Sequence, residues 1–148
     1  MTPRIVVLDF GAQYSQLIAR RVREQGVYSE IVPHTTRAAA LAGNGLAGVI
    51  LSGGPDSVSA PGSPRMDPAI LKLGVPVLGI CYGMQLLAKT LGAPVRPQST
   101  GEFGPARLRI LRPSPLLAGL AETENVWMSH GDHVQRPPSG FARLGRTF

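Results

Sequence analysis

The residues best suited to covalent chemistry lie in the stretch Gly79-Ile80-Cys81-Tyr82-Gly83. An apolar run at 75–80 leads up to the cysteine, and a helical pattern begins directly after it. This pattern is typical of a nucleophile elbow, in which a sharp strand-to-helix turn exposes the nucleophile and flanking glycines relieve crowding. The positive end of the helix dipole would also favour the thiolate, the reactive form of cysteine. Free cysteines are more often buried core residues, but the elbow favours a nucleophile here.

A thiolate that attacks a carbonyl carbon needs hydrogen-bond donors for the oxyanion that forms. The backbone N–H of Tyr82 suits this role because it follows the nucleophile in the elbow. A second donor is expected from Gly53 or Gly54, which follow the apolar run 46–51. Open α/β sheets bind ligands at the carboxyl ends of their strands. The sequence therefore predicts an acyl-transfer site at that edge of a sheet.

The same glycines belong to a competing motif, since residues 52–57 match the Ser-Gly-Gly-x-Asp-Ser loop of ATP pyrophosphatases. A phosphate-binding loop of this type should lead directly into a helix, whose N-terminus binds the anion. Here Pro55, Pro61 and Pro64 follow in quick succession and predict a long loop instead. A nucleotide-binding domain is therefore the weaker alternative, and it leaves Cys81 unexplained.

The elements that would position these residues alternate between strand and helix. Continuous apolar runs predict buried parallel strands, and they lie at 5–8, 46–51 and 75–80, with a weaker strand at 27–32. Helices are expected at 14–25, with Tyr14, Leu17, Ile18 and Val22 on one face, and at 82–91. This alternation predicts an α/β fold with an open, mostly parallel sheet flanked by helices.

The pattern changes after Gly92, where strands without intervening helices are expected. These strands are predicted at 94–98, 106–111, 126–129 and 141–145, with a Gly-rich connection at 99–105 and a short helix at 114–120. Trp127 and Met128 are expected in the core. Asp9, at the end of the first strand, is expected to cap the loop that follows it, and His34 is expected at the surface.

Together these motifs resemble the class I glutamine amidotransferases, over essentially the whole chain. The resemblance rests on residues 8–14 (LDFGAQY), 51–55 (LSGGP), 79–85 (GICYGMQ) and 127–132 (WMSHGD). It implies a flavodoxin-like sheet and one amidotransferase domain over residues 1–148. We also expect this domain to be truncated at its C-terminus, because the chain stops at Phe148 inside a strand-like run.

The resemblance also implies roles for individual residues. Cys81 would attack the side-chain amide of L-glutamine to form a thioester and release ammonia, with the backbone N–H groups of Tyr82 and Gly54 at the oxyanion. The glutamine pocket would be lined by Gly53, Gln85, Ser129, His130, Gly131 and Asp132. The family's catalytic His-Pro-Glu motif is missing from the sequence, whose histidines are His34, His130 and His133. We therefore expect the nucleophile and part of the pocket without a complete triad, and an inactive fragment.

The resemblance is closest to members whose ammonia is used by an ATP-pyrophosphatase synthetase, which converts xanthosine monophosphate to GMP. It implies a synthetase partner, as a fused domain or a separate subunit, that requires ATP and magnesium, and a homodimeric complete enzyme. No cofactor or metal is expected in this domain itself. A non-catalytic domain that only binds a partner synthetase is the remaining alternative.

Composition excludes several other classes. The net charge is +6, but the basic residues are scattered and aromatic residues make up only 5%, so a nucleic-acid surface is not expected. No apolar stretch approaches the roughly 20 residues of a membrane span. The single cysteine rules out an intramolecular disulfide. We expect a cytoplasmic protein that binds neither nucleic acid nor membrane.

Overall fold

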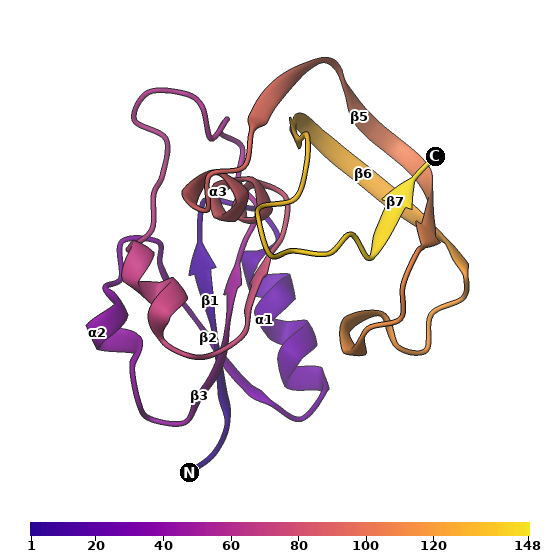
Figure 1. The fold of residues 1–148 in the computed structure, drawn as a ribbon. Helices are drawn as coiled ribbons and strands as arrows, with labels where there is room; N and C mark the ends of the chain where they lie inside the picture. The colour runs from indigo at the N-terminus through magenta and orange to yellow at the C-terminus, as the bar shows by residue number, and fades with distance from the viewer.

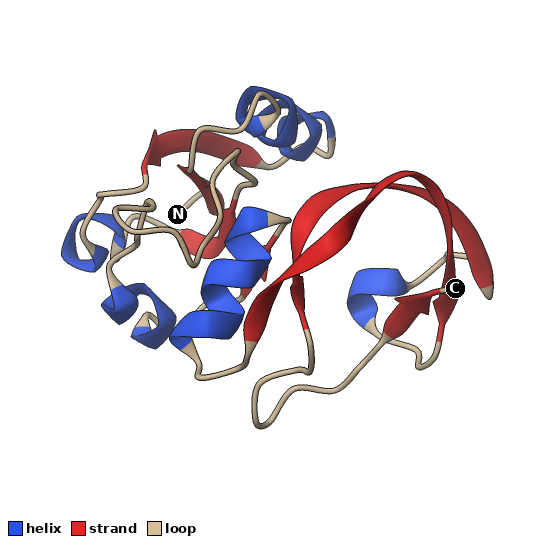
Figure 2. Cartoon of the chain, turned by 90° about the horizontal axis from the view of Figure 1, so that it is seen from above, coloured by secondary structure: helices blue, strands red, loops and turns tan.

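The computed structural model describes residues 1–97 and 101–148 in full and the backbone of residues 98–100 inside a strand. Within these residues the strands form a parallel sheet in the order β2-β1-β3-β4 and an antiparallel sheet in the order β6-β5-β7 (Figure 1). The parallel sheet and its helices occupy the first part of the chain. The antiparallel sheet forms a long curved ribbon that extends to one side of them (Figure 2).

The parallel sheet confirms the predicted α/β architecture. Its strands are β1 (Arg4–Asp9), β2 (Tyr28–Pro33), β3 (Leu46–Leu51) and β4 (Val77–Gly79). β1 pairs with both β2 and β3, so it lies in the middle of the sheet and its Val6, Val7 and Leu8 are fully buried. β4 is shorter than the predicted strand and pairs only with β3. Its Leu78 therefore stays partly exposed.

Helices cover both faces of the parallel sheet (Figure 2). On one face, α1 (Ser15–Glu24) packs on β1 and β2, where the Ser29 hydroxyl donates a hydrogen bond to the Ala19 carbonyl. Because neighbouring side chains of a strand point to opposite faces, each strand contributes side chains to the layers on both sides of the sheet. On the other face lie α2 (Ala38–Leu41), the 3₁₀ helix η1 (Pro68–Lys72) and α3 (Tyr82–Thr90). The main hydrophobic core forms between them and the sheet.

The buried face of α1 agrees with the prediction at Ile18 and Val22, which are half-buried, and differs from it at Tyr14 and Leu17. Ser15 and Ala19 are buried, whereas Tyr14 is 63% exposed and Leu17 is also exposed. The Ser15 hydroxyl donates to the carboxylate of Asp9, which also accepts the backbone N–H of Gly11. This contact confirms the capping role of Asp9. It also brings the small residues of α1 against the sheet, which turns Tyr14 toward solvent.

The antiparallel sheet differs most from the prediction. Its strands are β5 (Val95–Ile110), β6 (Thr123–Val134) and β7 (Gly145–Thr147). The predicted Gly-rich connection is instead part of β5, whose register against β6 shifts between Pro97 and Glu102. Glycines accommodate such a bulge as readily as a turn, and Gly101 has a φ of +57°. The strand predicted at 141–145 lies further along the chain as β7 and overlaps the prediction only at Gly145, and the predicted helix at 114–120 is a single 3₁₀ turn, η2 (Pro115–Leu117).

The placement of Trp127 in the core is also wrong. In the β5–β6 ribbon one face turns toward α3 and the other toward solvent, and Trp127 is on the solvent face with 75% of its surface exposed. Met128, on the opposite face, is half-buried and lines a cavity beside α3. A two-stranded ribbon buries only one of its faces, so an apolar residue on the other face remains exposed.

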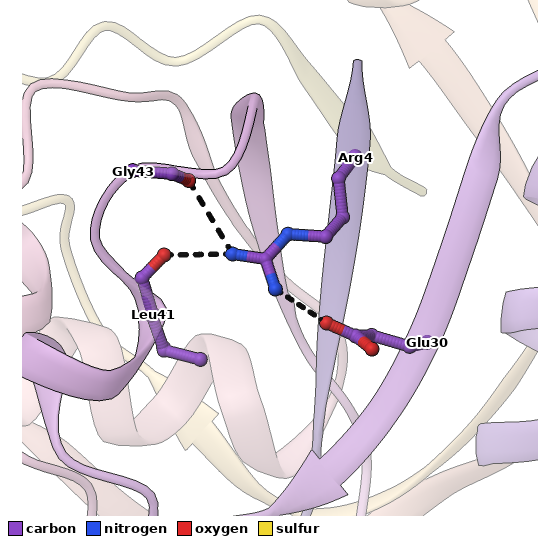
Figure 3. A network of polar contacts seen from close by, with 4 residues as sticks. All are labelled: Arg4, Glu30, Leu41 and Gly43. Carbon is purple, nitrogen blue, oxygen red and sulfur yellow. Dashed lines mark hydrogen bonds and ion pairs between the residues drawn. The ribbon is translucent and has the colours of Figure 1, made fainter. Parts of the chain in front are cut away.

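Arg4, at the start of β1, links several segments at the amino end of the sheet, opposite the predicted site (Figure 3). Its guanidinium lies 2.6 Å from the carboxylate of Glu30 on β2 and donates to the Leu41 carbonyl at 2.8 Å and the Gly43 carbonyl at 3.5 Å. One side chain therefore links β1, β2 and the segment that leads into β3. In the described part of the chain, no helix is both long and apolar enough to cross a membrane.

Candidate active site

Cys81 forms the turn between β4 and α3, as the elbow pattern predicts. Its φ and ψ are +51° and −113°, a left-handed backbone conformation that a residue with a side chain adopts only under strain. The flanking glycines are required by close packing. A Cβ on Gly79 would lie 2.6 Å from the Cα of Met84, and one on Gly83 would lie 2.3 Å from the Leu51 carbonyl oxygen. The turn leaves the Cys81 side chain exposed.

Tyr82 anchors the first turn of α3. Its ring is buried and packs against Phe10 at a centroid distance of 5.4 Å, and its hydroxyl donates to the Pro64 carbonyl. The buried Ser52 holds the neighbouring strand ends, because its hydroxyl accepts the Phe10 N–H at 3.0 Å and its carbonyl accepts the Gly83 N–H at 3.0 Å. These contacts fix the elbow against the carboxyl ends of β1 and β3.

The residues predicted to supply the oxyanion donors lie beside Cys81. Among the described residues, no acceptor is hydrogen-bonded to the backbone N–H of Tyr82 or of Gly54. A Cβ on Gly54 would lie 2.5 Å from the Phe10 carbonyl oxygen, so only glycine fits there. A Cβ on Gly53 would lie 3.5 Å from the Cβ of Cys81. Gly53 therefore adjoins Cys81, and Gly54 lines the same cavity as Cys81.

A cavity of about 360 Å³ opens beside the elbow. Its walls include eight of the nine predicted site residues, namely Gly54, Cys81, Tyr82, Gln85, Ser129, His130, Gly131 and Asp132. These residues come from three separate parts of the chain: the loop after β3, the start of α3 and the end of β6. Gly53 adjoins Cys81 without lining the cavity. Folding therefore brings the predicted residues together around the cysteine.

Asp132 joins the ribbon to the elbow. The buried Gln85 side chain donates from Nε2 to the Asp132 carbonyl at 3.0 Å, and the Ser57 hydroxyl donates to the Asp132 carboxylate at 2.6 Å. One residue of β6 is thus held by α3 and by the loop after β3. These bonds keep the far wall of the cavity over Cys81.

Among the described contacts, none of the three histidines is hydrogen-bonded to Cys81. His130 uses both ring nitrogens, since Nδ1 lies 2.6 Å from the Asp132 carbonyl oxygen and Nε2 lies 2.8 Å from the Glu102 carboxylate. His34 is half-buried, stacks on Phe10 and bonds the Arg65 carbonyl, so it is less exposed than predicted. His133 is exposed and lines a second cavity, between the ribbon and α3.

Sequence reasoning missed Ser57 and Glu102 as site residues. In the sequence Ser57 stands out only as part of a phosphate-binding loop, although it lies six residues beyond Leu51, the end of the strand that carries the site. Glu102 is hidden in the Gly-rich stretch that reads as a turn. Its place opposite His130 follows from the register of β5 and β6, which local patterns do not reveal.

The phosphate-binding alternative fails on the structure of its loop. Residues 52–67 contain no helix, and the loop ends in the short η1. The longer helix α3 does not follow this loop in the chain. It begins directly after Cys81, which is its N-cap residue. In the described residues, no group of three or more histidine, cysteine, aspartate or glutamate side chains could hold a metal ion.

A profile of the class I glutamine amidotransferases matches residues 6–147. The chain belongs to this family. It is 50% identical over 147 residues to the glutamine-hydrolysing GMP synthase of Carboxydothermus hydrogenoformans, and the aligned region covers 99% of this chain and 29% of that protein. It is 56% identical over 144 residues to the corresponding enzyme of Symbiobacterium thermophilum, and the aligned region covers 97% of this chain and 28% of that protein. This amidotransferase chain thus spans under a third of the length of these relatives.

Solved structures of amidotransferases share its fold. A Thermoplasma acidophilum protein described as a putative GMP synthase subunit superposes with a TM-score of 0.79 at 30% identity, over 99% of this chain and 74% of that one. A glutamine amidotransferase of Thermotoga maritima superposes with a TM-score of 0.73 at 22% identity, over 98% of this chain and 67% of that one. The second similarity concerns the fold alone.

Proposed function

We propose that this chain is the glutamine-hydrolysing domain of a GMP synthase and that Cys81 is its nucleophile. The observation that carries the proposal is the strained elbow, which presents the cysteine to a cavity whose polar walls come from three parts of the chain. A strained backbone persists only where the surrounding structure holds it, and such strain is concentrated at functional sites. The identity to GMP synthases along almost the whole chain supports the choice of substrate.

In the proposed reaction the Cys81 thiolate attacks the side-chain amide carbon of glutamine. The carbonyl oxygen becomes an oxyanion, which the backbone N–H groups of Tyr82 and Gly54 stabilise. The tetrahedral intermediate then breaks its carbon–nitrogen bond, and the nitrogen takes up a proton and leaves as ammonia. Water hydrolyses the resulting thioester to glutamate and restores the thiol. His130 already bonds through both of its ring nitrogens, so we assign it no role in carrying these protons.

We propose a fate for the ammonia from the similarity to GMP synthases. In a GMP synthase it would replace an oxygen of xanthosine monophosphate that a synthetase has first activated with ATP and magnesium. The synthetase would be either a fused domain or a separate polypeptide, and the complete enzyme a homodimer. Such a biosynthetic enzyme would work in the cytoplasm.

The test is covalent labelling of Cys81 by a glutamine analogue that carries an electrophile at the side-chain carbonyl, measured by intact mass. Cys81 is the only cysteine in the chain, so Cys81→Ser should abolish the added mass. We expect labelling to saturate with analogue concentration and to be slowed by glutamine but not by asparagine. Labelling that glutamine does not slow would contradict the proposal. Iodoacetamide, which needs no pocket, reports whether the thiol itself is reactive.

A further inference from the structure

Glu102 and His130 face each other across the β5–β6 ribbon. They are paired in the strand register directly after the shift that begins at Pro97, so the bulge itself sets which residue of β5 stands opposite the histidine. The Glu102 carboxylate lies 2.8 Å from Nε2 of His130. The pair lies 28 residues apart in sequence and joins the two strands beside the cavity wall.

The two side chains differ in what they can reach. His130 lines the cavity that contains Cys81, and it also lines the cavity between the ribbon and α3. Glu102 lines only the second of these cavities. The histidine side chain is 14% exposed and the glutamate 41% exposed. Glu102 therefore stands behind the wall of the proposed glutamine pocket, and its side chain contacts that wall through His130.

The hydrogen bonds fix the orientation of the imidazole ring. The Asp132 carbonyl oxygen and the Glu102 carboxylate can only accept, so each ring nitrogen of His130 carries a hydrogen: Nδ1 donates to the carbonyl at 2.6 Å and Nε2 to the carboxylate at 2.8 Å. The same carbonyl accepts Nε2 of Gln85, one turn into α3. A chain of contacts thus runs from Glu102 through the His130 ring to the Asp132 backbone and then to the helix that carries the nucleophile.

We propose that Glu102 is a positioning residue for substrate binding, an inference that rests on the proposed glutaminase function. By holding Nε2, it keeps the ring turned so that Nδ1 reaches the Asp132 carbonyl. This bond fixes the short segment Ser129 to Asp132, whose groups form the wall that faces Cys81. Without the carboxylate the imidazole ring is free to rotate, so the cavity wall loses the hydrogen bond that holds this ring. The hydrogen bonds that hold the elbow around Cys81 are unchanged. Loss of Glu102 therefore weakens binding of glutamine and leaves the reactivity of the bound complex nearly unchanged.

The experiment compares Glu102→Met and Glu102→Gln in the full chain. Methionine keeps the length of the side chain and removes its oxygens, whereas glutamine keeps a group that can hydrogen-bond Nε2. With the electrophilic glutamine analogue, we expect Glu102→Met to raise KI about tenfold, equivalent to about 1.4 kcal/mol, with kinact changed less than about twofold. Glu102→Gln should stay within about twofold of the original KI. Glu122→Ala, at the exposed far end of the ribbon, is the matched control.

A second readout does not depend on glutamine. The ring nitrogen resonances of His130, assigned with His130→Asn, should show a protected Nδ1–H in the original chain and in Glu102→Gln. This signal should be lost in Glu102→Met. Persistence of the signal in Glu102→Met, or a KI equal to that of the original chain, would overturn the role of Glu102 and leave the proposed function intact. If the original chain shows no glutamine-protected labelling, the proposed function and this inference fall together.

Discussion

The packing of α3 against the parallel sheet predicts a severe effect of Gly83→Ala. A Cβ at this position would lie 2.3 Å from the carbonyl oxygen of Leu51 and 2.6 Å from its carbonyl carbon. Both atoms belong to the backbone of a central strand, so neither can rotate away. The helix would have to move off the sheet, which would loosen the core contacts of Tyr82 and Leu86. Overpacking typically costs 1–3 kcal/mol, and we expect about 3 kcal/mol because the contacts are with backbone.

Urea unfolding followed by circular dichroism measures this loss. For a domain of this size, about 3 kcal/mol corresponds to a fall in Tm of roughly 6–12 °C. The matched control is Gly131→Ala, where an added Cβ would meet no atom within 4 Å, so the change should stay within about 0.5 kcal/mol. A Gly83→Ala protein as stable as the original would refute the close approach of α3 to β3 and, with it, the steric account of the elbow.

Three other parts of the chain lead to predictions of their own. Arg4→Met should cost about 2 kcal/mol in urea unfolding, between the values for exposed and buried ion pairs, whereas Arg20→Met, whose ion pair is exposed, should have almost no effect. The backbone N–H groups of Ala38 and Ala69 hold the pKa of Asp67 below its ordinary value of 3.8; the resulting stability is present above that pH and disappears as the pH falls through the lowered pKa. Asp67→Asn should therefore destabilise the protein at pH 7 but not in strong acid, and an equal loss at both pH values would contradict this. The single Trp127 should be quenched by acrylamide nearly as well in the native protein as in concentrated guanidinium, and strong native protection would place it in a core after all.

The local part of the fold follows from short stretches of sequence. The continuous apolar runs predict β1 and β3, and the strand-turn-helix pattern around Cys81 predicts the elbow, because each depends only on residues that are neighbours in the chain. The order of the strands adds one further constraint. Parallel strands all end at the same edge, so a cysteine and a glycine pair that each follow a strand must come together there.

The glycines after Gly92 show where this reasoning stops. A glycine-rich stretch reads equally well as a turn or as a bulge inside a strand, and the choice depends on the partner strand. Here β6 continues the pairing past Gly101 and Gly104, so β5 is one strand. The same partner decides that Trp127 faces solvent, because only one side of the ribbon has α3 to cover it.

From the sequence alone, the elbow at Cys81 and eight of the residues around the cavity could be predicted. The tertiary structure decided how those residues are held: Ser57 and Gln85 bind Asp132, and Glu102 binds His130. These contacts join positions between 28 and 75 residues apart. A hydrogen bond over such a distance depends on the register of two strands and the packing of a helix, and neither is encoded in the residues next to either partner.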